Sequence, residues 1–187
     1  MENRKVQIID LAMQLIQQKG YVAFSYDDIS KQLGVTKASI HYHFEKKEDL
    51  GAAITDRIMQ RLDRFSNSNA SIASLSPKEK LEKFFTDRME RFSCYDICPI
   101  SSLQTDFESL PEAMQKKVKE ISEKELLIIT NILREIQEQG DLQSSDDVES
   151  LALMILAASK GVLQYQRVLG KDFFADFMKQ VSNLTVK

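Results

Sequence analysis

Residues 25–50 constrain the fold of this chain more than any other stretch, because they contain two short helix signals with a glycine between them. Ser25, followed by Asp28 three residues later, forms a capping box that predicts the start of a helix. Gly34 supplies a turn, and the hydroxyl oxygen of Thr36 can cap a second short helix. Two short helices joined by a glycine-containing turn form the helix-turn-helix pattern.

A longer amphipathic helix precedes this pattern. Apolar residues recur at helical spacing over residues 4–19, and Gly20 stands where a left-handed residue would end the helix. Three helices are therefore expected to share a small core. Its expected members are Val6, Ile9, Met13, Ile16, Phe24, Ile29, Leu33, Val35, Ile40 and Phe44.

The rest of the chain also reads as helix. Residues 47–66 predict a connecting helix, and residues 66–76 predict a linker because they contain five Ser and two Asn. Ser76, Pro77 and Glu79 then restart the helical pattern, and Ser144 or Ser145 is expected to cap a later helix. We expect an all-α fold of about nine helices, with one domain at 1–46, a connector at 47–66 and a second domain at 76–187.

Composition agrees with a helical globular protein. The 187 residues are 43% hydrophobic and include only six Gly and three Pro. No apolar run reaches the ~18 residues needed to span a bilayer. Two cysteines cannot form a disulfide framework and no secretory signal is recognisable, so a cytoplasmic protein without membrane contact is expected.

Positive charge gathers at the helix-turn-helix pattern although the whole chain carries a net charge of −3. Lys31, Lys37, Lys46 and Lys47 oppose only Glu45 between residues 31 and 47, so 4 − 1 gives +3. A local basic patch of this kind favours nucleic acid as a partner. Since the second helix of a helix-turn-helix lies in the major groove, Lys37 is placed to donate to guanine and Lys47 to bind phosphate.

The run from Lys37 to Phe44, KASIHYHF, closely resembles the TetR/AcrR family of bacterial transcriptional regulators. The resemblance covers roughly residues 5–55 and includes Gly20-Tyr21, Phe24-Ser25 and the trailing Lys47-Glu48. It implies an operator-binding head, a helical effector domain and a homodimer held by the last two helices. It also implies repression that is relieved by a small molecule.

The resemblance assigns roles residue by residue. Ser25 and Tyr26 match positions that contact phosphate, and residues 37–39 match positions that read bases. Tyr42, His43 and Lys47 match positions that contact the backbone of DNA. The residues expected to bind operator DNA are Ser25, Tyr26, Thr36, Lys37, Ala38, Ser39, His41, Tyr42, His43, Lys46 and Lys47.

Three positions depart from the family pattern. His41 replaces the usual first Tyr of an aromatic pair, and Ala38 replaces a frequent Gly. Lys46 replaces a common Ser or Asn N-cap, so the fourth helix is expected to be less well capped, and this extra cation is expected to meet phosphate instead.

An effector cavity with apolar walls and a few polar groups is expected in the second domain. The residues expected to line it are Phe85, Met89, Phe92, Cys98, Leu103, Gln104, Phe107, Gln164, Tyr165 and Arg167.

Cys94 and Cys98 have two interpretations. Small buried side chains are the more common outcome, because free Cys is among the most buried residue types. Alternatively Cys98, which precedes Pro99 and an expected helix start at Ser101 or Ser102, is a thiol sensor for reactive electrophiles. No metal site is expected, since His41 and His43 point about 200° apart on a helix.

Residues 151–163 are almost continuously apolar, which predicts burial on more than one side, and small residues at 157–161 favour a dimer interface. Two other function classes stay open. A helical protein-interaction module without DNA binding is one. An enzyme is the other, although no cofactor motif and no catalytic set of residues stands out.

Overall fold

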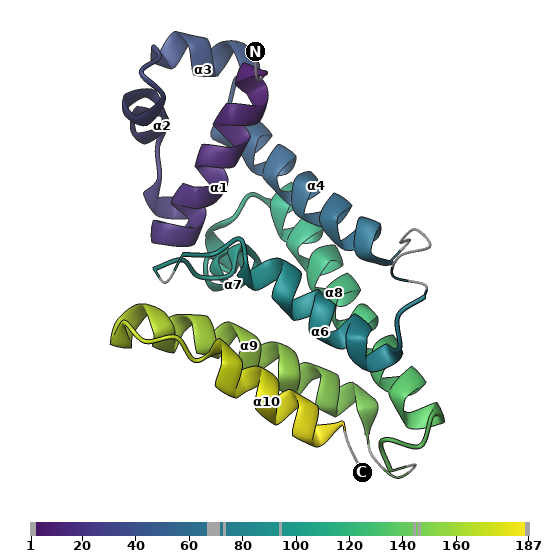
Figure 1. Ribbon diagram of the computed structural model, residues 1–187. Coiled ribbons are helices and arrows are strands. Elements are labelled where there is room, and N and C mark those ends of the chain that lie inside the picture. The colour runs from purple at the N-terminus through teal and green to yellow at the C-terminus, as the bar shows by residue number, and fades with distance from the viewer. Residues whose placement is uncertain are drawn as a thin grey trace. The chain divides into compact units, whose positions relative to one another are not determined.

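The structure, a computed structural model, describes residues 3–66, 72, 74–93, 95–143, 145 and 147–185. These residues form nine α-helices and one short 3-10 helix, without any strand (Figure 1), so the all-α prediction is confirmed. The elements are α1 (Arg4–Ala23), α2 (Tyr26–Leu33), α3 (Lys37–His43), α4 (Lys47–Ser66), α6 (Pro77–Met89), α7 (Pro99–Thr105), η1 (Phe107–Ser109), α8 (Glu112–Glu138), α9 (Val148–Leu169) and α10 (Phe174–Leu184).

Two compact units divide the chain, and they do not follow its order. Unit 1 comprises Met1–Gln60 and Cys98–Ile121, and unit 2 comprises Arg61–Ile97 and Ser122–Lys187. Helices α4 and α8 each contribute to both units. Packing therefore groups residues 98–121 with the N-terminal helices, whereas the sequence-based division assigned them to a second domain at 76–187.

The core of α1, α2 and α3 is formed by side chains that are almost fully buried. Phe24, Ile29 and Ile40 occupy it as expected. The expectation for α1 was partly wrong, because Val6 and Ile9 are only half-buried while Ile8 is completely buried. Helix α1 packs against α7 as well as α2 (Figure 1), so its buried face is wider than a three-helix core requires.

Local sequence signals determine where α2 ends and where α2 and α3 begin. Both halves of the capping box between Ser25 and Asp28 are present at the start of α2. Gly34 ends α2 with φ of 63°, a left-handed conformation that glycine adopts without a steric penalty. Thr36 accepts the N–H of Ser39 and so caps α3. These three predictions are confirmed.

Helix starts in the second half of the chain agree less well with the sequence patterns. The capping box of Ser76 and Glu79 is present. The short helix expected to begin at Ser101 begins at Pro99 instead. Asp147 caps α9 by accepting two backbone N–H groups, whereas the expected cap was Ser144, which lies outside the described residues, or Ser145. None of the described helices is long and apolar enough to cross a membrane.

Unit 2 contains a buried ionic cluster that joins α6, α8 and α9. The carboxylate of Glu125 is 2% exposed and lies 2.6 Å from Arg88 Nη2 and 2.7 Å from Lys160 Nζ. Burial opposes ionisation of Glu125, but the two cations outweigh it and hold the pKa of this carboxyl below its ordinary value. The cluster therefore requires all three helices to be in place.

Glu125→Gln is expected to destabilise the protein by about 3 kcal/mol, because removing one partner of a buried ion pair leaves the cations without their carboxylate. Urea unfolding at one fixed protein concentration measures this loss. Glu123→Gln, which removes an exposed carboxylate from the same helix, is the matched control. Equal stability of the two variants would contradict this role of Glu125.

Candidate nucleic-acid interface

Helix α3 presents an exposed face from its first residue to its last. Lys37 and Ala38 are exposed, the side chain of Tyr42 is 87% exposed, and Ser39 is half-buried. Ile40 lies on the opposite side and is completely buried. The helix is therefore anchored by its apolar side and leaves the expected base-reading positions on its surface.

Lys37 is held by an ion pair on this surface. Its Nζ lies 2.8 Å from Asp27 Oδ2 of α2, and both side chains are about half exposed at 54% and 53%. An ion pair this exposed contributes only about 0–1 kcal/mol. Lys37 can therefore leave Asp27 for another acceptor at low cost.

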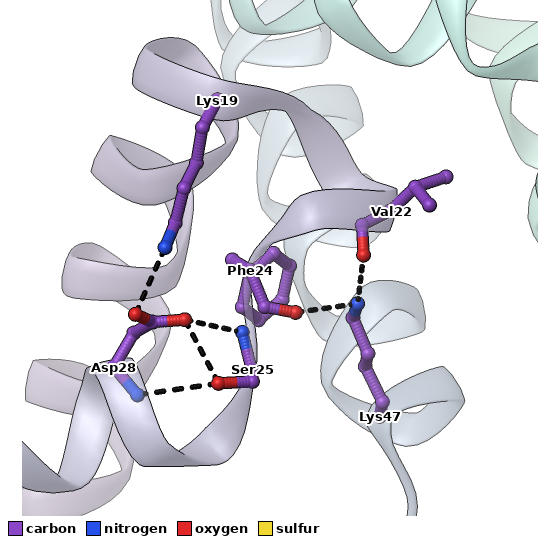
Figure 2. Close-up of polar contacts among 6 residues, drawn as sticks. All are labelled: Lys19, Val22, Phe24, Ser25, Asp28 and Lys47. Carbon is purple, nitrogen blue, oxygen red and sulfur yellow. Dashed lines mark hydrogen bonds and ion pairs between the residues drawn. The ribbon is translucent and has the colours of Figure 1, made fainter.

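The hydroxyl of Ser25 is engaged in capping. Its Oγ donates to Asp28 Oδ2 at 2.8 Å and also accepts the N–H of Asp28 (Figure 2). Asp28 in turn lies 2.9 Å from Lys19. The hydrogen bonds from Lys19 and Ser25 lower the pKa of Asp28 to about 2. Ser25 thus uses its proton within the protein.

Tyr26 is likewise committed to a protein contact. Its hydroxyl donates to the carbonyl of Phe44 at 3.0 Å, and its ring meets the ring of His41 edge-on at 4.8 Å. Burial, with the nearby Asp49 second, raises the pKa of Tyr26 to about 12. These contacts join the start of α2 to the end of α3.

Lys47 lies against the segment between α1 and α2. Its Nζ donates to the carbonyls of Phe24 at 2.6 Å and Val22 at 3.2 Å (Figure 2). The ammonium also lies over the rings of Tyr21 and Phe24 at 4.7 and 4.4 Å. Burial lowers the pKa of Lys47, although Asp106 opposes this effect. A third N–H of the ammonium remains after these two hydrogen bonds.

Three further positions keep groups that can face DNA. Thr36 accepts the N–H of Ser39 through its oxygen, which leaves its own hydroxyl proton to donate. His41 Nδ1 donates to the carbonyl of Glu45 at 2.9 Å, so Nε2 is its outward ring nitrogen. Lys46 is exposed. Its backbone N–H donates to Asp49 Oδ2 at 2.8 Å, which is the half of a capping box that the helix itself supplies.

The residues expected to line an effector cavity are distributed over both units. Phe85 is 3% exposed and packs edge-on against Phe84 and Phe177 in the core of unit 2. Met89 and Phe92 of unit 2 are half-buried. Gln164, Tyr165 and Arg167 are exposed on α9. The four expected residues of unit 1 are Cys98, Leu103, Gln104 and Phe107.

An open-sided cavity of about 310 Å³ in unit 2 is lined by none of these residues. Its apolar wall is formed by Phe65, Ile128 and Ile132, and Lys80 and Glu135 form an ion pair at 2.5 Å beside it. Its remaining lining residues are Ser66, Ile72 and Asn131. No pattern in the sequence predicted this cavity, because its lining brings together Ile72 and residues of α4, α6 and α8, whose positions in space a linear pattern does not contain.

Cys98 is 3% exposed, at the position just before α7. This burial agrees with the structural interpretation of that thiol. Cys94 lies outside the described residues. Within the part of the chain that the structure describes, no group of three or more His, Cys, Asp or Glu is placed to hold a metal ion.

Two acidic residues make contacts in this region that the sequence did not predict. Asp28 was recognised only as a capping residue, and its ion pair with Lys19 was not foreseen. Asp106, 85 residues away from Tyr21, accepts the N–H of Tyr21 at 2.7 Å. No local pattern could have revealed that contact, since it depends on how α7 packs against α1.

Lowering the pH from about 4 to about 2 is expected to remove the contribution of Asp28 to stability. The pKa of Asp28 is depressed in the folded state to about 2 from an ordinary 3.8. Its contribution is therefore complete above the ordinary value and lost as the pH falls through the folded one. Melting temperatures of the wild type and Asp28→Asn measure this effect. They should differ at pH 5 and converge near pH 2; a constant difference would contradict it.

Comparison with known proteins places this interface in a family. Residues 8–54 match the family model described as bacterial regulatory proteins, tetR family, and residues 77–180 match the tetracyclin repressor-like C-terminal domain. The HTH-type transcriptional repressor DhaR of Mycobacterium sp. is 22% identical over 161 residues, which are 86% of this chain and 81% of that protein.

Two further similarities extend this finding. The biofilm operon icaADBC HTH-type negative transcriptional regulator IcaR of Staphylococcus epidermidis is 33% identical over 119 residues, 62% of this chain and 59% of that protein. A crystal structure of a TetR transcriptional regulator from Legionella pneumophila is 34% identical, with a TM-score of 0.80, and the match covers 100% of this chain and 99% of that one. The chain therefore belongs to the TetR family of DNA-binding transcriptional regulators.

Proposed function

We propose that this regulator is a repressor whose α3 reads the operator in the major groove and whose release is triggered by a small molecule. The observation that carries the proposal is the exposed face of α3, anchored by Ile40 and open at residues 37–39 and at Tyr42. A recognition helix contacts base edges through residues near its N-terminus. Lys37, Ala38 and Ser39 occupy that end of α3.

Lys37 is the main base-reading residue in this proposal. A lysine ammonium suits guanine O6 and N7, and the hydroxyl of Ser39 suits either kind of edge. Asp27 holds Lys37 by an exposed ion pair until DNA arrives. The carboxylate of Asp27 also repels any phosphate that approaches Lys37, so this cation is better suited to base edges than to the backbone.

The phosphate grip surrounds this helix. Tyr42, His43, Lys46 and the remaining N–H of Lys47 are proposed to contact the backbone, which fixes register without reading sequence. The hydroxyl of Thr36 and Nε2 of His41 add polar contacts at the two ends of α3. Ser25 and Tyr26 belong to the proposed interface too, and their protons must leave Asp28 and Phe44 before they can donate to phosphate.

Lys37→Ala is expected to relax base preference at one operator position, at a cost of about 1–3 kcal/mol for the preferred base. Selection of binding sites from a random DNA pool, followed by affinity measurements on single-base variants, tests this. Lys31→Ala removes an exposed cation from the end of α2 and should leave the selected sequence unchanged. A wild-type protein that selects no DNA would favour the protein-interaction alternative instead.

The effector is proposed to bind in unit 2. The cavity beside Lys80 and Glu135 supports this, because about 310 Å³ reaches the lower end of the range for small-molecule sites and its lining combines apolar side chains with polar ones. A ligand there must bind the DNA-free conformation more tightly than the DNA-bound one to release the operator. Competition of candidate compounds against the selected operator identifies it.

A reactive electrophile is the second candidate for the trigger. Cys98 immediately precedes Pro99 and α7, so modification of its thiol would disturb the start of that helix. Its 3% exposure requires that α7 open before the thiol reacts. If Cys98→Ser is released from DNA by N-ethylmaleimide as readily as the wild type, this trigger is excluded.

Dimerisation is proposed to use α9 together with α10. Tyr165, Val168 and Leu169 are 68%, 81% and 60% exposed, and Leu153 is 60% exposed on the same helix. Exposed apolar residues grouped in this way mark an interaction site. Two copies joined here would carry two heads for two operator half-sites. Ser159, one of the small residues expected at the interface, is instead buried within the chain's own core.

Val168→Glu is expected to make the protein monomeric at micromolar concentration, because each copy would bury an uncompensated charge. Sedimentation velocity measures the change. Leu127, on α8, is also an exposed large apolar residue at 52%, and Leu127→Glu should remain dimeric. Dissociation of both variants, or of neither, would argue against the α9 interface.

A further inference from the structure

Helix α1 is interrupted at Gly20, where φ is 86° and ψ is 166°, and a short helical turn follows it. The first N–H groups of such a turn lack partners within the helix. Asp106 satisfies two of them, because its Oδ2 accepts from Tyr21 at 2.7 Å and from Val22 at 3.2 Å. A carboxylate that lies 85 residues away in the chain thus caps this turn.

Gly20 fits this contact closely. A Cβ at residue 20 would lie 2.8 Å from Asp106 Oδ2, and a φ of +86° already disfavours other residues. The backbone of Gly20 therefore approaches the carboxylate as nearly as sterics permit. A side chain at residue 20 would therefore require the carboxylate of Asp106 to move.

The same segment is held from its other side by Lys47. Asp106 accepts from the N–H groups of Tyr21 and Val22, and Lys47 donates to the carbonyls of Val22 and Phe24. The next residue, Ser25, starts α2. We call residues 21–24 with these two charged partners the α1–α2 clamp. The clamp sets the direction in which the chain enters the helix-turn-helix.

The position of Asp106 is determined by α7. Asp106 is the C-cap of α7, and one turn earlier Ser102 Oγ donates to the carbonyl of Ile16 at 2.8 Å in a buried contact. Ser102 and Asp106 therefore join α7 to α1 at two places within unit 1. A shift or unwinding of α7 would withdraw the carboxylate from the clamp.

We infer that Asp106 is a positioning residue for operator binding, which transmits the state of α7 to the helix-turn-helix through the α1–α2 clamp. This inference rests on the proposed function. With the carboxylate in place, α2 and α3 are held in the conformation that binds DNA. Without it, that conformation is a smaller fraction of the ensemble, and apparent affinity falls by the same fraction.

The change in charge alone predicts the opposite effect on affinity for DNA, so the two explanations can be distinguished. Removing a negative charge from a DNA-binding unit should strengthen binding to phosphate. Asp106→Ala should nevertheless weaken binding to the selected operator by about tenfold, a factor of the order of one net intramolecular hydrogen bond. The dependence of affinity on salt should keep its slope, since no phosphate contact is lost.

The experiment compares three variants with the wild type by fluorescence anisotropy on the selected operator duplex at several salt concentrations. Asp106→Asn keeps the size of the side chain and one acceptor oxygen, so it should fold normally and lose less affinity than Asp106→Ala. Glu108→Ala removes an exposed carboxylate two residues away and reports the effect of charge alone. It should bind as tightly as the wild type or slightly more tightly.

Amide hydrogen exchange supplies a readout that a purely structural role would not change. Because coupling between two sites is reciprocal, operator binding should slow exchange in residues 99–109 of the wild type. The same segment should not respond in Asp106→Ala. An exchange response that is unchanged in Asp106→Ala, or an affinity equal to that of Glu108→Ala, would overturn the inference while the proposed function stands. A wild type that binds no DNA would overturn both.

Discussion

The N-terminal unit depends on how the backbone between α1 and α2 obtains its hydrogen bonds. At Gly20 the chain leaves helical geometry, so the first N–H groups of the short turn that follows have no partners in the preceding helix. Charged side chains supply them. Asp106 accepts from the first N–H groups, Lys47 donates to two carbonyls, and Asp28 accepts from the N–H of Ser25. The direction in which α2 begins therefore depends on how this segment is held, and α3 follows from α2.

Three residues that were expected to contact DNA also make hydrogen bonds that hold the helix-turn-helix together. Lys47 donates to two carbonyls within the protein, and Ser25 takes part in a capping box. Tyr26 donates to the carbonyl at the end of α3. The exposed side chains gather on α3, where Tyr42 is the most exposed and Lys37 is held by an exposed ion pair with Asp27. Ser25, Tyr26 and Lys47 thus stabilise the helix-turn-helix, whereas the exposed residues of α3 are proposed to contact the bases of DNA.

Unit 2 is held together by a different combination of forces. The ring of Phe65 meets that of Phe84 edge-on, Phe84 meets Phe85, and Phe85 meets Phe177. Aromatic quadrupoles favour this edge-on arrangement. Beside them Glu125 satisfies two cations away from water. Most of the exposed large apolar side chains among the described residues of unit 2 lie on α9. That surplus of exposed apolar surface is what supports a second copy as partner.

Sequence alone determined the features that local chemistry controls. The capping residues Ser25 and Thr36, the left-handed Gly34 and the apolar spacing of each helix predicted an all-α chain with a helix-turn-helix near its start, since these signals act within one turn of backbone. Only the tertiary structure decided that Asp106 reaches Tyr21, that Ile8 rather than Ile9 is fully buried, and that residues 98–121 pack with the N-terminal helices. Those outcomes depend on which helices meet in space, and a one-dimensional pattern does not specify contacts between residues so far apart in the chain.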